Sequence, residues 1–332
     1  MRYLVQFPAG WDGLVSQLLQ SSLTGFRPVF ADDSAIMFDS KATFGQVDDL
    51  PFAKNLFLVW TSAPRRNVGK TIGQLAATVP PAIRPRKPDP AGFRVMVHID
   101  GGLAPVEVTV RSQLERSLAT RTGQRVQSRG GNREYWVMGR RDLDQLLLLE
   151  RLPRRRKLPT RKGALAPELA AALVMAGGPH PEDRFLDPFA GSGALTLARS
   201  RQPARSITYG DVDLANLRAD LPGELLRDRR VRTIDDDALI LPSIGDHTID
   251  AIVTDPPWGE YEELDRPYPE FAAAMATSLR RVLADGGRLV LLSTRRNQDL
   301  ITDALGEAGF RLGPAFQILV NGHPASAITA VV

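Results

Sequence analysis

The 332-residue chain contains no cysteine and only four histidines. The lack of cysteine excludes disulfides, thiolate metal sites and cysteine nucleophiles together. The histidines (His98, His180, His247 and His323) lack the spacing typical of metal ligands, so the sequence predicts no metal site. No apolar run approaches the roughly 18 residues that a membrane span needs, and we expect no membrane insertion. The first residues do not read as a secretory leader, so we expect a cytoplasmic protein.

The composition is otherwise that of a globular protein, with 43% hydrophobic and 24% charged residues. The charges are unevenly divided along the chain. Residues 1–162 contain 26 Lys+Arg and 14 Asp+Glu, a net charge of +12, whereas residues 163–332 contain 16 and 24, a net charge of −8. A field of one sign over a whole domain usually serves to attract a charged partner. The sequence therefore predicts a basic module that binds a polyanion, joined to an acidic module.

The most strongly charged stretch is the segment 151–162, in which seven of twelve residues are basic and two are prolines. Because proline opposes helix, we expect an extended linker here between a domain at 1–150 and another at 163–332. A basic linker can be merely solvated, or it can lie on a phosphate backbone, and the basic domain before it favours the second interpretation. Its candidate nucleic-acid-binding residues are Arg154, Arg155, Arg156, Lys157, Arg161 and Lys162.

The first 150 residues mix strands and helices. Strands are expected at 2–7, 35–39, 55–61, 93–99 and 133–139, and helices at 13–20 and 111–121. A proline-rich segment at 80–90 lies between them, so we expect two small α+β units that divide near 80–90. No catalytic cluster occurs in this half of the chain.

Strands and helices alternate in residues 163–332. Strands are expected at 185–187, 207–210, 231–234, 249–254 and 288–293, and helices at 167–176, 194–200, 214–220, 269–283 and 299–308. This alternation predicts an α/β fold with a doubly wound parallel sheet. Two further strands at 316–320 and 327–332, joined around Asn321-Gly322, predict a terminal hairpin added antiparallel to the sheet edge.

Acidic and glycine residues follow the first three strands of this sheet. The first strand ends in Asp187-Pro-Phe-Ala-Gly-Ser-Gly193, where glycines allow close approach of a ligand and the following helix offers free N–H donors. The second ends at Asp211, which is placed to accept hydrogen bonds from both hydroxyls of a ribose. The third leads into Asp235-Asp-Asp-Ala238, where a carboxylate could meet an adenine amine. Singly, each acid is better explained as a helix cap or a solvated loop residue, but together they indicate a nucleoside site.

The fourth strand delivers Asp255-Pro-Pro-Trp-Gly259, the sharpest signal in the chain. The prolines fix the backbone and remove N–H donors, which leaves carbonyl oxygens to accept. An Asp255 oxygen and the Pro256 carbonyl could then hold both hydrogens of a planar exocyclic amine and turn its lone pair toward an electrophile. Trp258 offers a stacking face for a base removed from its helix. The simpler alternative, a structural Pro-Pro turn with a buried Trp, is disfavoured by the order of the preceding motifs.

These motifs resemble those of S-adenosylmethionine-dependent amino-methyltransferases. The segment from Lys162 to Ala172 resembles the lead-in of the THUMP-associated guanine-N2 RNA methyltransferases, which act on tRNA and 23S rRNA. Asp237-Ala238 with Leu241-Pro242 resembles the third motif of that family. The resemblance implies a Rossmann-like class I methyltransferase domain with S-adenosylmethionine as cofactor. It also implies a smaller N-terminal α+β region with ferredoxin-like and THUMP-like parts.

The resemblance and the motifs together assign roles to individual residues. The catalytic candidates are Asp255, Pro256, Pro257 and Trp258, and the cofactor candidates are Asp187, Ala190, Gly191, Ser192, Gly193, Asp211, Val212, Asp237, Ala238 and Asp255. The expected partner is RNA, bound in part by the basic linker. A compact chain with one small basic half favours a folded tRNA over rRNA. No long apolar stripe calls for a second subunit, and we expect a monomer.

Other functions stay open on the sequence alone. A 23S rRNA guanine-N2 methyltransferase would use the same site. Methylation of an adenine amine in DNA shares the Asp-Pro-Pro-aromatic motif, but only about ten residues separate Trp258 from the helix at 269–283, which is short for reading a duplex groove. A catalytically silent RNA-binding or assembly factor could keep the fold. Methylation of a protein glutamine is a lesser option, because that chemistry usually has Asn where Asp255 stands.

Overall fold

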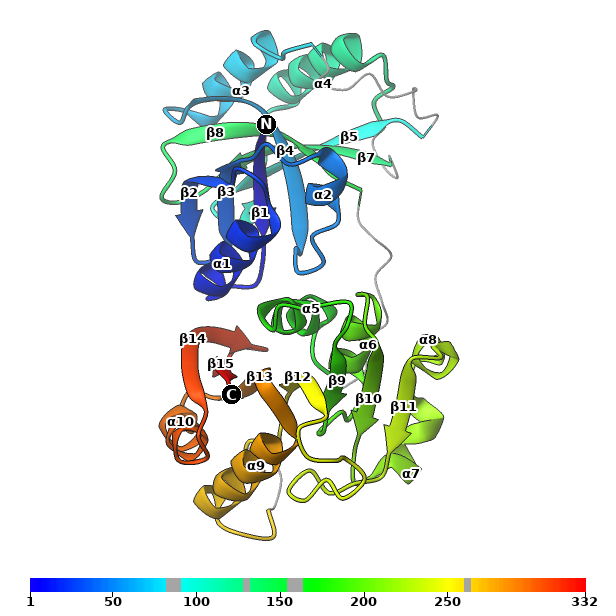
Figure 1. Cartoon of the computed structure of the whole chain (residues 1–332). Coiled ribbons are helices and arrows are strands. Elements are labelled where there is room, and N and C mark those ends of the chain that lie inside the picture. The colour runs from blue at the N-terminus through cyan, green and yellow to red at the C-terminus, as the bar shows by residue number, and fades with distance from the viewer. Residues whose placement is uncertain (82–90, 128–131, 154–163, 260–263) are drawn as a thin grey trace. The chain divides into compact units, whose positions relative to one another are not determined.

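The structure is a computed structural model that describes residues 1–81, 91–127, 132–153, 164–259 and 264–332 (Figure 1). By its internal contacts the chain divides into two compact units. Unit 1 comprises Met1–Phe7 and Leu19–Lys157, and unit 2 comprises Pro8–Leu18 and Leu158–Val332. The main division thus falls within the predicted linker at 151–162.

One eight-stranded sheet forms the centre of unit 1. Its order is β2-β3-β1-β4-β8-β7-β5-β6, and all neighbours are antiparallel except β5 and β7. Strands from both sides of residues 82–90 share this sheet, because β4 pairs with β8. The strands are β1 (Arg2–Gln6), β2 (Arg27–Asp32), β3 (Ala35–Asp39), β4 (Asn55–Pro64), β5 (Phe93–Ile99), β6 (Gly102–Leu103), β7 (Arg133–Gly139) and β8 (Gln145–Arg151).

The described part of the first 153 residues also contains four helices. They are α1 (Asp12–Ser22), α2 (Phe44–Asp48), α3 (Val68–Ala77) and α4 (Val108–Thr122), of which α1 lies mostly in the segment assigned to unit 2. α3 and α4 pack against each other, and they contact β4, β5 and β8 (Figure 1). Asn67 begins α3 by accepting a hydrogen bond from the Lys70 N–H at 3.0 Å, and Gly123 ends α4 in the left-handed conformation.

A seven-stranded sheet forms the centre of unit 2, in the order β11-β10-β9-β12-β13-β15-β14. Strands β9 to β13 pair in parallel, and β15 runs antiparallel to both β13 and β14. This doubly wound order confirms the predicted α/β, Rossmann-like fold class. The strands are β9 (Arg184–Asp187), β10 (Ser206–Gly210), β11 (Val231–Ile234), β12 (Ile249–Thr254), β13 (Leu283–Thr294), β14 (Arg311–Val320) and β15 (His323–Val331).

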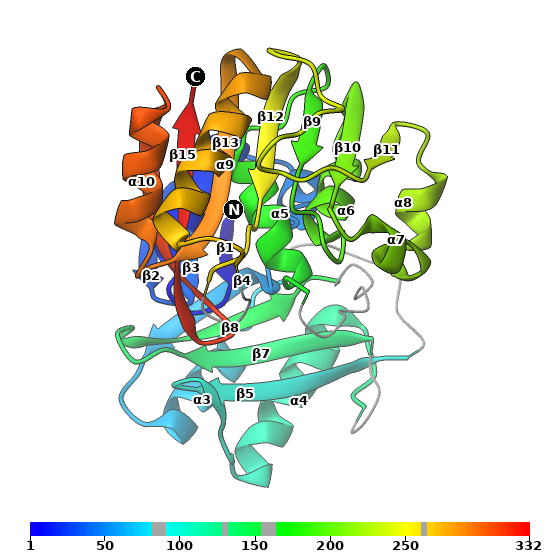
Figure 2. The same cartoon turned by 90° about the horizontal axis from the view of Figure 1, so that it is seen from below.

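Helices cover both faces of this sheet. α9 and α10 lie side by side (Figure 2), and their apolar sides pack on core residues that include Ile252 and Leu291. Gly177, just past α5, approaches Val253 and Val290 on the other face, since side chains alternate along a strand. The helices are α5 (Pro167–Ala176), α6 (Ala194–Ser200), α7 (Leu214–Leu217), α8 (Gly223–Arg227), α9 (Tyr268–Val282) and α10 (Gln298–Glu307).

The terminal hairpin forms where the sequence predicted it. Val320 pairs with His323 across a two-residue turn, in which Asn321 and Gly322 have φ of +52° and +88°. Positive φ at both positions is the geometry that Asn-Gly adopts most readily in a tight hairpin. One detail differs from the expectation. β15 lies inside the sheet, between β13 and β14, so only β15 is antiparallel to the other strands and β14 forms the edge.

Candidate active site

Four parallel strands of unit 2 end at one edge of the sheet, and the predicted motifs follow these ends directly. β9 ends at Asp187, β10 at Gly210, β11 at Ile234 and β12 at Thr254. β9 lies between β10 and β12, so the order of the strands reverses there. In open parallel sheets, ligands bind beyond the carboxyl ends of the strands at such a reversal. The topology therefore brings the glycine turn, the acidic residues and the Asp-Pro-Pro-Trp segment to a common edge.

The turn after β9 adopts a backbone geometry that favours glycine. Gly191 has a φ of +47° and Gly193 a φ of +76°. A Cβ at Gly191 would meet no described atom within 4 Å, whereas one at Gly193 would lie 3.0 Å from Leu225 Cδ1. The Ala190 N–H donates to the Gly210 carbonyl at 2.9 Å. Gly191 thus borders open space, while Gly193 packs closely against the protein.

Asp211 fixes this turn from the end of β10. Its Oδ2 accepts from the Gly191 N–H at 2.8 Å, and its Oδ1 accepts from the Asp213 N–H at 2.9 Å. Tyr209 donates its hydroxyl to the Gly191 carbonyl at 2.6 Å. Burial, reinforced by the charge of Asp211, raises the pKa of Tyr209, so the phenol stays protonated as a donor. Val212, the next residue, leaves its apolar side chain 73% exposed.

Asp187 acts as an anchor between elements. Its side chain is fully buried, and it accepts hydrogen bonds from the hydroxyls of Thr254, at 3.1 Å, and Thr196, at 3.3 Å. Burial raises the pKa of Asp187 to about 8; the two hydroxyl bonds oppose this shift, and the charges of Asp255 and Asp211 add to it. One carboxyl therefore ties β9 to β12 and to α6. A direct contact of Asp187 with a cofactor stays a prediction.

Two of the acidic residues after β11, Asp236 and Asp237, have different roles. Asp236 is buried and accepts from the backbone N–H of Ser243 at 2.9 Å and from its hydroxyl at 2.8 Å. Asp237 is exposed, and its Oδ1 accepts from the Leu239 N–H at 2.9 Å. Ala238 is buried. Asp236 thus stabilises the loop, while Asp237 keeps its carboxylate at the surface, where the sequence predicted an adenine contact.

In the segment after β12, an acidic side chain and an aromatic side chain are hydrogen-bonded to each other. The Trp258 indole N–H donates to Asp255 Oδ1 at 2.9 Å, and both side chains are half-buried. Pro256 is buried, and Pro257 is half-buried. A carboxylate has about four acceptor positions, so a single hydrogen bond does not by itself fill the group. Trp258, which is predicted to stack on the target base, thus lies beside Asp255, which is predicted to hold the amine of that base.

Residues outside the sequence motifs hold this loop in place. Asn297, which follows β13 and is buried, donates its Nδ2 to the Trp258 carbonyl at 2.8 Å. Gly259 has a φ of +69°, and a Cβ there would lie 2.7 Å from Cδ2 of Tyr268. Asn297 could have been found by its position, since it follows the predicted strand 288–293 and so belongs to the same edge. Thr196, inside the predicted helix 194–200, carries no such signal.

The basic linker residues lie outside the described residues. Arg154, Arg155, Arg156, Lys157, Arg161 and Lys162 therefore stay predicted contacts. Within the described ranges, no group of three or more His, Asp or Glu side chains could hold a metal ion. No helix in the described part of the chain is long and apolar enough to cross a membrane.

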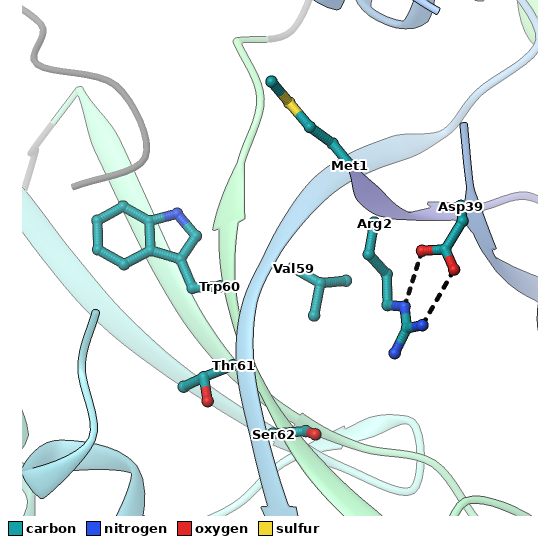
Figure 3. A pocket seen from close by; sticks show the side chains of 7 residues that line it. All are labelled: Met1, Arg2, Asp39, Val59, Trp60, Thr61 and Ser62. Carbon is teal, nitrogen blue, oxygen red and sulfur yellow. Dashed lines mark hydrogen bonds and ion pairs between the residues drawn. The ribbon is translucent and has the colours of Figure 1, made fainter. Parts of the chain in front are cut away.

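A hollow of about 280 Å³ lies in unit 1, lined by residues of β1, β3 and β4 (Figure 3). Arg2, at its wall, points to Asp39 and donates to both carboxylate oxygens, at 3.0 and 3.1 Å. Trp60 donates its indole N–H to Glu150 at 3.3 Å. The charged and polar groups named here are thus paired within the protein. None of the predicted site residues lines this hollow.

Comparisons with known proteins match parts of this chain to methyltransferases. Residues 154–217 match the UPF0020 family model, an RMKL-like methyltransferase domain. A tRNA (guanine(10)-N2)-dimethyltransferase from Methanothermobacter thermautotrophicus is 31% identical over 137 residues, which are 39% of this chain and 38% of that protein. The predicted resemblance is confirmed. A tRNA (guanine(6)-N2)-methyltransferase from Thermus thermophilus is 33% identical over 141 residues, or 40% of this chain and 41% of that protein.

The relatives also define how far the likeness extends. The chain spans about two fifths of the length of the two curated relatives that it matches. The crystal structure of TrmN from Thermus thermophilus matches with a TM-score of 0.70 and 22% identity, over 100% of this chain and 99% of that one. At this identity the structural match establishes the fold.

Proposed function

We propose that this chain is an S-adenosylmethionine-dependent methyltransferase that acts on the exocyclic N2 amine of a guanosine in RNA, with tRNA as the favoured substrate. One observation carries the proposal: neighbouring parallel strands present, at one edge, a glycine turn bound to Asp211 and the bonded pair Asp255–Trp258. The names of the two aligned relatives support tRNA as the substrate and the N2 amine as the target.

The residues beside the turn fit the proposed cofactor. Gly191 borders open space, and Asp211 is held by two backbone N–H groups with lone pairs left for ribose hydroxyls. Val212 offers an exposed apolar side chain next to that carboxylate, and Asp237 offers an exposed acceptor. When bound, S-adenosylmethionine supplies an electrophilic methyl group on a sulfonium. Asp187 stabilises the site through Thr196 and Thr254.

The chain's own residues would then prepare the amine. Asp255 and the Pro256 carbonyl accept its two hydrogens, which turns the nitrogen lone pair out of conjugation with the ring and toward the methyl group. Trp258, held by its bond to Asp255, stacks on the flipped guanine. Asp255 is also placed to receive the proton that the nitrogen gives up after reaction. The rate enhancement comes from positioning and from a preorganised polar site, so no histidine base is needed.

The basic first half completes the proposed enzyme. Residues 1–150 would act as a THUMP-like RNA-binding region, and the linker 151–162 would lie on the phosphate backbone. This arrangement favours tRNA over 23S rRNA, and we expect a cytoplasmic monomer. DNA adenine methylation and a silent RNA-binding role are the competing functions. The paired geometry at Asp255 favours an active site, and the aligned relatives favour RNA.

The test is a substrate survey with purified protein. Radiolabelled S-adenosylmethionine is incubated with bulk tRNA, rRNA or DNA, and the products are digested to nucleosides. We expect label in N2-methylguanosine from tRNA. Label in N2-methylguanosine from rRNA alone would contradict tRNA as the substrate. Label in methyladenine from DNA would contradict both the proposed substrate and the proposed target base. Cofactor binding without transfer to any of these would favour the silent role.

A further inference from the structure

Two adjacent arginines, Arg295 and Arg296, follow the carboxyl end of β13. Both are exposed, and within the described residues neither guanidinium has a hydrogen bond or an ion pair. Residues 163–332 contain two other Arg-Arg pairs, and in each one arginine is engaged by an acid: Arg230 bonds to Asp228, and Arg281 bonds to Asp246. The pair at 295–296 is therefore unusual in offering two unengaged cations.

The strand register places these arginines beside the proposed amine-binding loop. β12 and β13 pair in parallel, with Thr254 opposite Leu291. Trp258 and Arg295 are each four residues further along from that pair. β13 lies on the side of β12 away from β9, so the arginines belong to the side of the edge proposed for the target base.

Hydrogen bonds fix this short turn to the same loop. Asn297, next to Arg296, donates its side-chain amide to the Trp258 carbonyl at 2.8 Å. Its own backbone N–H donates to the Thr294 hydroxyl at 3.1 Å, and the Arg295 N–H donates to the Pro324 carbonyl at 3.2 Å. The backbone that carries the arginines is thus held on both sides, and it is bonded to the residue proposed to stack on the base.

The negative charge around this edge would oppose the binding of a polyanion unless cations such as these arginines offset it. Residues 163–332 have a net charge of −8, and Asp211, Asp237 and Asp255 all lie at this edge. A polyanion that approaches the edge meets repulsion from these carboxylates. Exposed guanidinium groups offset that repulsion, and they bind phosphate oxygens through paired, charge-assisted hydrogen bonds. The partner that fits a pair of cations beside a base pocket is the backbone next to the flipped base.

We propose that Arg295 and Arg296 bind the RNA phosphates that flank the target guanosine, and that Asn297 couples this contact to Trp258. The proposal rests on the proposed function for its choice of RNA. It adds a substrate contact in the catalytic unit itself, separate from the basic linker and the first half of the chain. These arginines would position the flipped nucleotide and take no part in methyl transfer.

The experiment compares three double variants of the full chain. Arg295→Ala/Arg296→Ala removes both charges, and Arg295→Lys/Arg296→Lys keeps them. Arg205→Ala/Arg229→Ala is the matched control. Both of its arginines are exposed, have no hydrogen-bonding or ion-pairing partner for the side chain within the described residues, and lie just before β10 and β11, at the amino edge of the same sheet. Each variant is assayed for tRNA affinity by filter binding across salt concentrations, for steady-state methylation of tRNA, and for cofactor affinity by calorimetry.

The alanine pair is expected to raise KM for tRNA about tenfold and to reduce the slope of log affinity against log salt by about 1.4, or about 0.7 for each lost single-strand phosphate contact. The lysine pair should keep most of the slope, because a point charge still binds phosphate. Cofactor affinity and the control variant should match wild type. A KM and salt slope equal to those of the control would overturn the proposal. Failure of the proposed function would give a different result, because the wild type itself would then transfer no methyl group to RNA. The slopes of log tRNA affinity against log salt would still decide whether the arginines bind RNA.

Discussion

The side-chain amide of Asn297 donates a hydrogen bond to the backbone carbonyl of Trp258 at 2.8 Å, across 39 positions of sequence. Asn297 occupies the N-cap position of α10, but its side chain makes no capping bond there. Asn67, the N-cap of α3, does use its side chain to cap its helix. The two asparagines thus hold equivalent positions at helix starts, and only Asn297 supports the loop after β12.

Asn297→Ala is predicted to impair turnover more than folding. Loss of the bond frees the Trp258 carbonyl and lets the loop shift, and small shifts at a reacting centre cost about ten- to a hundredfold in rate. We expect kcat to fall by that factor with cofactor affinity unchanged. Asn67→Ala is the matched control, expected to lower the free energy of unfolding by about 1 kcal/mol and to leave kcat near wild type. Equal kcat values for the two variants would contradict the role of Asn297.

Asp255→Ala is predicted to abolish methyl transfer while keeping most cofactor binding. The variant loses the acceptor for the target amine and the partner of the Trp258 indole, whereas the turn held by Asp211 is untouched. Single-turnover methylation and calorimetric cofactor binding measure the two properties separately. Near-normal methylation by this variant would refute the assignment of Asp255.

Gly259→Ala is predicted to disturb the loop through a specific collision. The new Cβ would lie 2.7 Å from the Tyr268 ring, at a φ of +69°. We expect kcat to fall at least about tenfold, since the loop next to Trp258 must move. Gly286→Ala controls for backbone strain, because Gly286 has a φ of +73° and a Cβ there meets no described atom within 4 Å. If both substitutions reduce kcat alike, strain and not the contact with Tyr268 is responsible.

Asp187 makes the stability of unit 2 depend on pH. Its pKa of about 8 lies above the ordinary value of 3.8, so the native state holds a proton that the unfolded state releases. The free energy of unfolding therefore loses about 1.4 kcal/mol per pH unit from this group as pH rises from about 4 to about 8. Below that window both states are protonated, and above it both are ionised, so the contribution is constant outside it.

Asp187→Asn removes this dependence, because an amide does not titrate in that window. Urea unfolding at about pH 5 and about pH 7 should show the variant gaining stability relative to wild type as pH rises. Asp250→Asn is the control with the opposite sign. The Arg184 guanidinium holds the pKa of Asp250 below its ordinary value, so its contribution is lost only in acid. A difference between wild type and Asp187→Asn that does not change with pH would contradict the raised pKa.

The alternating half of the chain could be predicted because its signals are local. Residues 249–254 match β12 exactly, and the Asn321-Gly322 turn appears with the expected geometry. β8 was missed because its four leucines, 146–149, are buried on both faces of the sheet and show no alternation. The order of the sheet in unit 1 was also out of reach, since the pairing of β4 with β8 joins residues about 90 positions apart and no local pattern encodes it.

In the site, too, residues that follow a predicted strand could be found from the sequence, whereas contacts between distant segments could not. Asp211 and Asp255 were found because each directly follows a recognisable strand, and parallel strands share their carboxyl edge. The role of Asp187 as a buried anchor was not, because it depends on hydroxyls from Thr196 and Thr254 on two other elements. The fixed position of the Trp258 backbone likewise depends on Asn297, a side-chain contact between distant segments.

The reversal of strand order at β9 has a kinetic consequence. Apart from Asp255, the residues proposed for the cofactor extend from β9, β10 and β11, and those proposed for the base and its phosphates extend from β12 and β13. Two ligands that occupy neighbouring parts of this edge, on either side of the boundary between β9 and β12, need not pass each other on the way in or out. We therefore expect a ternary complex that either substrate can enter first, with intersecting initial-rate lines. The modified RNA could then depart before or after the spent cofactor, so one encounter with an RNA need not end after a single methyl transfer.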